Sequence, residues 1–370
     1  MPRLPHAQQG IALLTALLVM AIAVMVAAAV ISTQHYDVKI QTNIQQLERA
    51  YQYTSGIEQM AGLWLQRDLK LNQTDSLLDT WATTLPEMPI KDGETVIGSF
   101  SGKMEDLQGL FNLNTLLDDK GNQTDLGQTL FDKLIKAQTL PAHFRLSVTD
   151  WMDKDSATQH ANSAEADFYM TSKPAYFAAN QPFADPSELF LVRLDSLAPE
   201  ETRKKLDELL KISSALPSKA FTKININTAP EALLQILVPN DVQMIVATRQ
   251  NQPYDQDGLN NFITTTSSDL KKEFQSIIPN PNYKPAQGDK PEEGEPFNKL
   301  QWSNVFGVTS NYFRLRGLIK IGSVRLNTIS LLERTESGEI RILMRRFEYT
   351  TEQNQTPSEL SPLDLNQTAQ

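Results

Sequence analysis

The hydrophobic pattern begins with one long apolar run near the amino terminus. Residues 11–31 carry no charge, and as a helix rising about 1.5 Å per residue they would span roughly 31 Å, close to the hydrocarbon thickness of a bilayer. Arg3 and the terminal amine precede this run, so the positive-inside bias places Met1 in the cytoplasm. The pattern predicts a single-pass anchor with the rest of the chain on the far side.

Helical periodicity continues beyond the membrane. Ile40, Ile44, Leu47 and Tyr51 follow at spacings of four, three and four, with polar residues between them, which is typical of an amphipathic helix. We therefore expect one helix from about residue 11 to residue 69, embedded in lipid first and packed on a globular domain later.

Strand-like alternation occurs on both sides of a long helical region. Apolar and polar residues alternate over residues 94–107, and again over 312–321, 324–332 and 340–349. These segments predict one antiparallel sheet, interrupted by about 200 residues that read mainly as helices. The expected fold is α+β: a long N-terminal helix packed on an antiparallel sheet, as in pilins, with a large mainly helical insertion.

Composition narrows the functional classes. The 370 residues have a net charge of −10 and no cysteine, so nucleic acid is repelled and neither disulfides nor a thiol nucleophile are available. We find no nucleophile elbow and no glycine-rich phosphate loop after a strand. The sequence therefore predicts a protein that is not an enzyme and does not bind nucleic acid.

The junction at Gly10 separates three interpretations of the anchor. A secretory signal peptide has a shorter apolar region, although Ala27 to Ala29 could mimic its cleavage site, and a plain signal anchor would leave Gly10 unexplained. A glycine after a polar leader and directly before such a helix resembles the class III leader of type IV pilins and pseudopilins. The resemblance implies that prepilin peptidase cuts between Gly10 and Ile11 and methylates Ile11.

Thr15 departs from that pattern, because most members of the pilin class have glutamate at mature position five. An amino terminus in hydrocarbon, at the positive end of a helix dipole, needs a nearby anion. The Thr15 hydroxyl can bond the Ile11 carbonyl of its own helix, but it offers no charge to a neighbouring subunit. This suits a terminal position in a fibre; the alternative is a merely tolerated polar residue.

Two short phrases repeat the pattern Asn-x-Asn-Thr, within residues 111–116 and 224–236. In the second, Thr228 and Glu231 predict a capping box. The second phrase also resembles the first helix of helix-hairpin-helix DNA-binding modules. Residues 237–244 lack the glycines that let such a hairpin meet phosphate, so we favour the capping interpretation.

An acidic segment carries the remaining candidate chemistry. Residues 150–169 contain five carboxylates, and the phrase Asn-Gln-Pro-Phe begins soon after them at Asn180. Together with the Gly10 leader, Thr15 and the second Asn-x-Asn-Thr phrase, these segments resemble the protein K family of type II secretion systems, its large minor pseudopilins. The resemblance extends to about residue 350.

The resemblance implies an insertion of two similar subdomains with a calcium site. Calcium takes six to eight oxygen ligands, and the nearest candidates are Asp150, Asp153, Asp155, Glu165 and Asp167. The alternative is a solvated acidic loop in which Asp150 and Asp155 act as caps. The spacing is not that of an EF-hand.

The expected domain order follows from these segments. It runs as a leader (1–10), a transmembrane part (11–31), a pilin-like helix and first strand (32–110), a subdomain with the acidic loop (111–222), a second subdomain with a proline-rich loop (223–300), the sheet (301–350) and a disordered tail (351–370).

The function implied by the resemblance is that of a minor pseudopilin at the tip of the periplasmic pseudopilus. It would help to start assembly and support the export of folded proteins across the outer membrane, from an anchor in the inner membrane. The implied partners are minor pseudopilins I and J, other pseudopilins, prepilin peptidase, and the secretin or exported proteins. The alternatives are a minor pilin of a type IV pilus and an unprocessed, membrane-anchored periplasmic binding protein.

Overall fold

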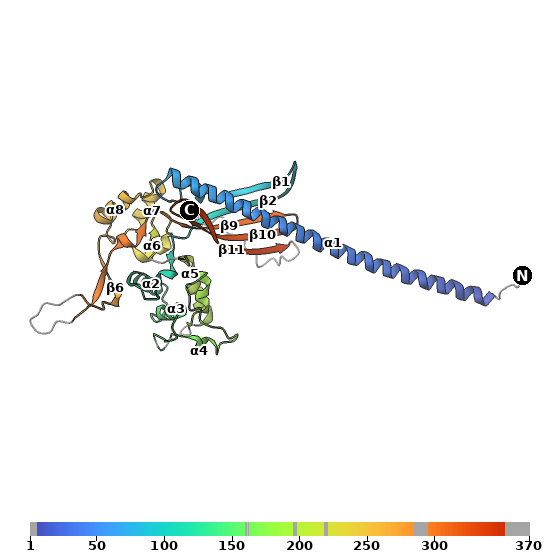
Figure 1. Ribbon diagram of the computed structural model, residues 1–370, viewed down its shortest axis with the longest axis horizontal. Helices are drawn as coiled ribbons and strands as arrows, with labels where there is room; N and C mark the ends of the chain where they lie inside the picture. The colour runs from blue at the N-terminus through green and yellow to red at the C-terminus, as the bar shows by residue number, and fades with distance from the viewer. Residues whose placement is uncertain are drawn as a thin grey trace, which may run out of the picture.

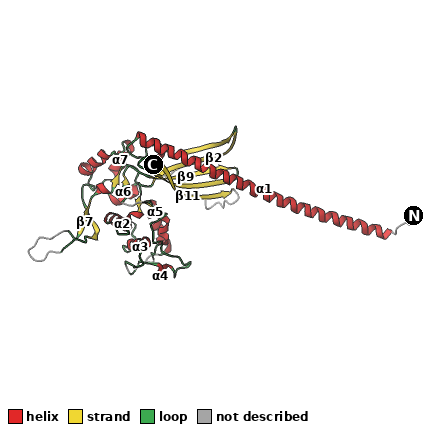
Figure 2. Ribbon diagram, in the orientation of Figure 1, coloured by secondary structure: helices red, strands yellow, loops and turns green. Residues whose placement is uncertain are grey.

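The computed structural model describes residues 6–159, 161, 163–194, 198–217, 221–284 and 295–351. One helix, α1 (His6–Leu71), contains 66 residues and is therefore roughly 99 Å long. Its first half projects away from the globular part, and its second half lies along the sheet (Figures 1 and 2). The prediction of a single continuous N-terminal helix is confirmed, and this helix is long and apolar enough to cross a membrane.

The packed half of α1 begins later than the apolar stripe suggested. Ile40 and Ile44 are 56% and 51% exposed, so these side chains do not pack on the sheet. Contact begins at Asn43 and Gln46, which accept hydrogen bonds from Ser323 Oγ at 3.0 and 3.1 Å. Apolar contact follows at Leu47 and at Tyr51, whose ring meets Phe347 edge to face with centroids 4.9 Å apart. The exposed stretch between the membrane and the sheet is thus available to other helices.

The sheet has five antiparallel strands in the order β1-β2-β9-β10-β11. Their bounds are Leu85–Asp92, Thr95–Asp106, Tyr312–Ile321, Val324–Arg334 and Ile340–Thr351. Four of them match the predicted segments. Sequence analysis missed β1, because Pro86 and Pro89 obscure its alternation, and proline is tolerated in such an edge strand because the outer N–H needs no partner.

An ion pair between buried Glu58 and partly exposed Arg345 fixes α1 to the sheet. Glu58 of α1 is 2% exposed, and its carboxylate accepts hydrogen bonds from Ser330 Oγ at 2.6 Å and from Arg345 Nε and Nη2 at 2.8 Å. Charge-assisted bonds of this kind are the stronger ones in proteins. They set the rotation of α1, so that its buried residues Ala50, Ile57 and Leu65 face the sheet.

The insertion occupies the end of the molecule opposite the amino terminus of α1 (Figure 1). Its helices are α2 (Asp125–Ala137), α3 (Phe144–Met152), α4 (Ala166–Tyr169), α5 (Pro199–Lys211), α6 (Glu231–Leu237), α7 (Val242–Asn251) and α8 (Gln256–Asn261). Short 3₁₀ helices are η1 (Thr80–Ala82, before the sheet), η2 (Leu113–Leu116), η3 (Pro186–Leu191) and η5 (Trp302–Asn304), and η4 (Phe262–Thr266) is a π-helix. Short strands pair as β3 (Phe111–Asn112) with β4 (Ser213–Ser214), β5 (Ile224–Asn225) with β8 (Phe306–Gly307), and β6 (Phe274–Pro279) with β7 (Phe297–Leu300). The fold class is confirmed.

The repeated Asn-x-Asn-Thr phrases have the same geometry in both halves of the insertion. Asn114 donates to the carbonyl of Phe183 and accepts from its N–H, at 2.9 and 2.8 Å. Asn227 holds Tyr254 in the same way, again at 2.9 and 2.8 Å. In each half a side-chain amide thus substitutes for a strand partner. One continuous hydrophobic core runs through both halves.

The predicted capping box at Thr228 is wrong. Helix α6 starts after Pro230 without a side-chain cap, because the Thr228 hydroxyl donates instead to Asp106 Oδ2 at 2.6 Å. Asn225 Nδ2 donates to the same carboxylate and to Ser310 Oγ, at 3.0 and 2.9 Å. The motif therefore joins the insertion to the end of β2, and burial raises the pKa of Asp106.

Three predictions fall partly or wholly outside the described residues. The leader is described only from residue 6. The proline-rich loop is described only up to residue 284 and from residue 295, and the expected tail lies beyond residue 351.

Candidate functional site

The acidic group lies in the first half of the insertion, between α3 and α4. Helix α3 carries Asp150 in its interior and ends at Asp153, while Glu165 occupies the position before α4. Asp155 lies on the loop between them. Because the loop folds back, residues separated by ten positions in the sequence meet at the end of α3.

Three of the predicted ligands form a compact group. Carboxylate oxygens of Asp153, Asp155 and Glu165 lie within 4.8 Å of one another. Asp153 and Glu165 are buried, at 7% and 6% exposure, whereas Asp155 is exposed. Asp150 lies beside the group, and its Oδ2 accepts from Ser163 Oγ and from the Gln159 N–H at 3.0 Å.

Several carboxylate oxygens in this group have no donor among the described residues. They are Asp150 Oδ1, Asp153 Oδ1 and both oxygens of Glu165, all buried. A buried charge without a partner is costly. Burial and the neighbouring charges of Asp155 and Asp150 raise the pKa of Asp153 to about 6. Burial and the same acidic neighbours raise the pKa of Glu165 to about 7.

The donor set fits a hard cation such as calcium, which prefers carboxylate and carbonyl oxygens. Asp153, Asp155 and Glu165 would hold it, with Asp150 Oδ1 within the same buried region. The capping alternative accounts for two oxygens, because Asp155 Oδ1 accepts from the Ala157 N–H at 2.8 Å and Asp150 Oδ2 accepts from the Gln159 N–H at 3.0 Å. The exposed Asp167, in the first turn of α4, is not brought into the group.

A second acidic group, which sequence analysis missed, lies at the end of α1. It consists of Asp68, Asp75 and Asp79, and burial raises the pKa of Asp68 to about 6. Here the carboxylates have partners: Arg334 Nη2 bonds both oxygens of Asp75, at 2.7 and 2.5 Å, and Asn72 Nδ2 donates to Asp68 at 2.9 Å. Asp79 also accepts a hydrogen bond, from the Ser76 N–H at 2.6 Å. Each of the three carboxylates thus has a hydrogen-bond donor, and Arg334 offsets one of the three charges, so we interpret the group as a buried ionic joint between α1 and β10.

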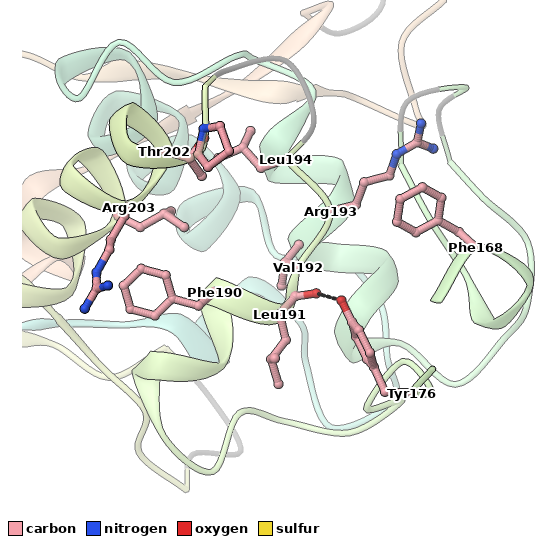
Figure 3. Close-up of a pocket in the computed structure, with 11 residues that line it drawn as sticks. Phe168, Tyr176, Phe190, Leu191, Val192, Arg193, Leu194, Thr202 and Arg203 are labelled. Atoms are coloured by element: carbon pink, nitrogen blue, oxygen red, sulfur yellow. Dashed lines mark hydrogen bonds between the residues drawn. The ribbon is translucent and has the colours of Figure 1, made fainter. Parts of the chain in front are cut away.

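A shallow pocket of about 720 Å³ lies in the same half of the insertion (Figure 3). It is lined by Phe168, Tyr176, Phe190 and Arg193, among others. Arg193 lies 4.2 Å from the centroid of the Phe168 ring, and its Nη1 donates to the Ser163 carbonyl at 3.1 Å. Since Ser163 also bonds Asp150, the pocket wall and the acidic group share one loop.

The predicted processing site lies at the exposed start of α1. Gly10 and Ile11 are both helical, and the Ile11 side chain is 64% exposed. Thr15 is exposed on the same stretch. Thr33 and Thr42 of α1 bond the carbonyl four residues back, at 3.0 and 2.8 Å, which shows that this helix accommodates threonine hydroxyls in the way expected for Thr15.

A projecting N-terminal helix, whose second half packs on an antiparallel sheet, defines a pilin-like protein. The large insertion with its acidic loop narrows the class, and the family model described as type II secretion system protein K matches residues 109–212. The chain is 31% identical over 257 residues to type II secretion system protein K of Klebsiella pneumoniae, covering 65% of this chain and 74% of that protein. The chain belongs to this family and is a minor pseudopilin.

Other relatives extend the match over most of the chain. Type II secretion system protein K of Pseudomonas aeruginosa is 29% identical over 355 residues, covering 91% of this chain and 92% of that one. A chain in the crystal structure of the GspK-GspI-GspJ complex from enterotoxigenic Escherichia coli superposes with a TM-score of 0.58 at 22% identity, covering 82% of this chain and 97% of that one. The family resemblance predicted from the sequence is thus confirmed, and the relatives are secretion-system components rather than enzymes.

Proposed function

We propose that this minor pseudopilin forms the tip of a periplasmic pseudopilus, where it helps to start assembly and supports the export of folded proteins. In this proposal it begins as an inner-membrane precursor with its bulk in the periplasm. Prepilin peptidase cuts after Gly10, and Ile11 becomes the methylated terminus.

The observation that carries the tip position is the place of the insertion. In a fibre whose N-terminal helices pack side by side, a further subunit would have to stack above the globular part. The insertion fills the space at that end of α1 (Figure 1), so it would obstruct such a subunit. Thr15 supports the same position, because it offers no carboxylate to the terminus of a neighbour.

The partners proposed are minor pseudopilins I and J, since the similar solved chain comes from a GspK-GspI-GspJ complex. The exposed stretch of α1 before the sheet offers apolar side chains such as Val38, Ile40 and Ile44 for helix packing. Other pseudopilins would follow below, and the secretin or exported proteins would meet the insertion above.

Calcium would act as an internal brace of the insertion. Bound between α3 and the start of α4, it would compensate the buried charges of Asp153 and Glu165. A chain without cysteine cannot fix this loop with a disulfide, so a cation is the available substitute.

The tip position can be tested with a single label. Because the chain has no cysteine, Phe177→Cys, at an insertion residue that is 67% exposed, takes a maleimide-gold label at one place. Isolated pseudopili should carry gold at one end only. Gold spaced along the shaft would contradict the proposal. The same labelling on a Thr15→Glu background shows whether the missing carboxylate contributes to the end position.

A further inference from the structure

The face of the sheet opposite α1 has a charge that differs from that of the whole chain. The pairing register places residues of β2, β9, β10 and β11 on this outer face in rows, such as Lys103 beside Arg316, Arg316 beside Ile329, and Ile329 beside Arg346. Residues one position along each strand point to the core under α1. We call the outward residues the outer sheet face.

The outer sheet face is basic. Over these four strands it carries seven basic and three acidic side chains. Glu87 of β1 adds a fourth acidic side chain, which accepts a hydrogen bond from Lys320 Nζ at 3.0 Å. The basic residues are Lys103, Arg314, Arg316, Lys320, Arg325, Arg341 and Arg346; the acidic ones are Glu105, Glu333 and Glu348. The whole chain has a net charge of −10, so this face contrasts in sign with the rest.

One carboxylate at the centre of the face is shared by three cations. Glu105 Oε1 lies 2.7 Å from Lys103 Nζ, and its Oε2 lies 2.7 Å from Arg314 Nη2 and 3.1 Å from Arg316 Nε. These four side chains together have a net charge of +2, and Asp185 also attracts Arg314. Although burial opposes ionisation, Arg314, Lys103 and Arg316 together lower the pKa of Glu105 to about 2, so the carboxylate is charged at every physiological pH.

A small cavity lies where the outer sheet face meets the insertion. It has a volume of about 70 Å³ and is lined by Arg314, Arg316 and Arg346, with Leu331 and Met344 as apolar walls. Asp185, at its rim, already caps η3 by accepting from the Ser187 N–H at 2.9 Å. The charged residues of the lining are the three arginines and Asp185, a net charge of +2, and Arg346 Nε also lies 3.3 Å from Glu348 Oε1. The cavity has the size to take one carboxylate side chain, and arginine binds carboxylates with two parallel hydrogen bonds.

We propose that the outer sheet face is a docking surface for a protein segment rich in aspartate and glutamate, one of whose carboxylates enters the cavity between Arg314, Arg316 and Arg346. A second copy of this face would oppose like charges, so the partner is a different surface. Such complementarity steers encounter and fixes register.

A protein partner fits better than an anionic membrane. The contact of α1 with the sheet begins at Asn43, which accepts a hydrogen bond from Ser323 Oγ, and the 12 residues after Ile31 separate it from the membrane by roughly 18 Å of helix. Interactions between exposed charges decay over about 8–10 Å at physiological salt. The outer sheet face thus lies beyond the reach of lipid headgroups when α1 stands upright.

The test uses the full chain in neutral detergent and a fluorescein-labelled decapeptide of alternating glutamate and serine. Fluorescence polarisation at low salt should show binding that weakens as salt is added. The charge reversal Arg341→Glu with Arg346→Glu should weaken it at least about tenfold, since these side chains are 56% and 52% exposed. Arg346→Lys should retain binding better than Arg346→Glu.

The matched control reverses two exposed charges elsewhere, Arg203→Glu with Lys204→Glu on α5. It should leave the peptide affinity within about twofold, with thermal midpoints of all variants unchanged. An equal loss in the control, or no peptide binding at low salt, overturns the proposal. Tighter binding to phosphatidylglycerol vesicles or to a single-stranded oligonucleotide, removed by the same reversal at Arg341 and Arg346, also overturns it.

Discussion

Replacing Glu165 by glutamine should stabilise the insertion in the absence of calcium and weaken its response to calcium. Both oxygens of Glu165 are buried without a hydrogen-bond donor among the described residues, and Asp153 and Asp155 lie next to it. Without a cation, the ionised glutamate repels its neighbours, so a neutral amide of the same shape should stabilise the fold. With calcium, the same change removes a ligand.

The magnitude follows from the pKa. Burial and the acidic neighbours raise the pKa of Glu165 from 4.5 to about 7, so at pH 8 its ionisation costs the chelated fold about 3 kcal/mol. In a domain of this size each kcal/mol moves the thermal midpoint by about 2–4 °C. The variant should therefore melt about 6–12 °C higher than the parent in chelator. Calcium at about a hundred times its dissociation constant should raise the parent by about 2.7 kcal/mol, and the variant by much less.

The assay is thermal unfolding of the full chain in detergent at pH 8, with EGTA or with calcium, for the parent, Glu165→Gln and the control Asp167→Asn. Asp167 is exposed and lies outside the group, so its variant should respond like the parent. Parent midpoints that are equal with EGTA and with calcium would refute the site. A loss of the calcium response in Asp167→Asn would show that the ligand set is different.

Three further outcomes are expected. In chelator the thermal midpoint should fall as pH rises from 5 to 8. The pKa values of Asp153 and Glu165 are raised to about 6 and about 7, so these groups favour the folded state when protonated and lose that contribution as they ionise. Calcium should make the midpoint less dependent on pH. Arg334→Met should lower the free energy of unfolding, measured with a chemical denaturant, by about 3–5 kcal/mol, because it leaves Asp75 buried without its ion-pair partner. The control Arg341→Met, at a side chain that is 56% exposed, should lower it by less than about 0.5 kcal/mol. Gly10→Val should accumulate as full-length precursor in membrane fractions, detected by its mass.

The elements with strong periodicity were predictable from the sequence. The long helix and four of the five sheet strands follow from apolar residues that repeat about every 3.6 or every 2 positions. An element with one buried and one exposed face needs such a repeat. The edge strand β1 was not predictable in this way, because Pro86 and Pro89 break the pattern while the backbone still pairs on one side.

The chemistry of the insertion was predictable only in part. A second repeated phrase, Asn-Gln-Pro-Phe at Asn180 and Asn-Gln-Pro-Tyr at Asn251, would have strengthened the prediction of two similar halves, since Phe183 and Tyr254 are the partners of the motif asparagines. The destination of the Thr228 hydroxyl depends on β2, more than a hundred residues away. Capping rules consider only neighbours along the chain, so they could not predict this contact. Likewise, the fold of the loop, and not the spacing in the sequence, decides that Glu165 belongs to the acidic group and that Asp167 does not.

The most direct test of the account is the mass of the amino-terminal peptide of the protein purified from cells that contain prepilin peptidase. Processing as a pseudopilin predicts a peptide that begins with N-methylated Ile11. An intact Met1 terminus, or a terminus near Val30 produced by ordinary signal cleavage, would contradict it.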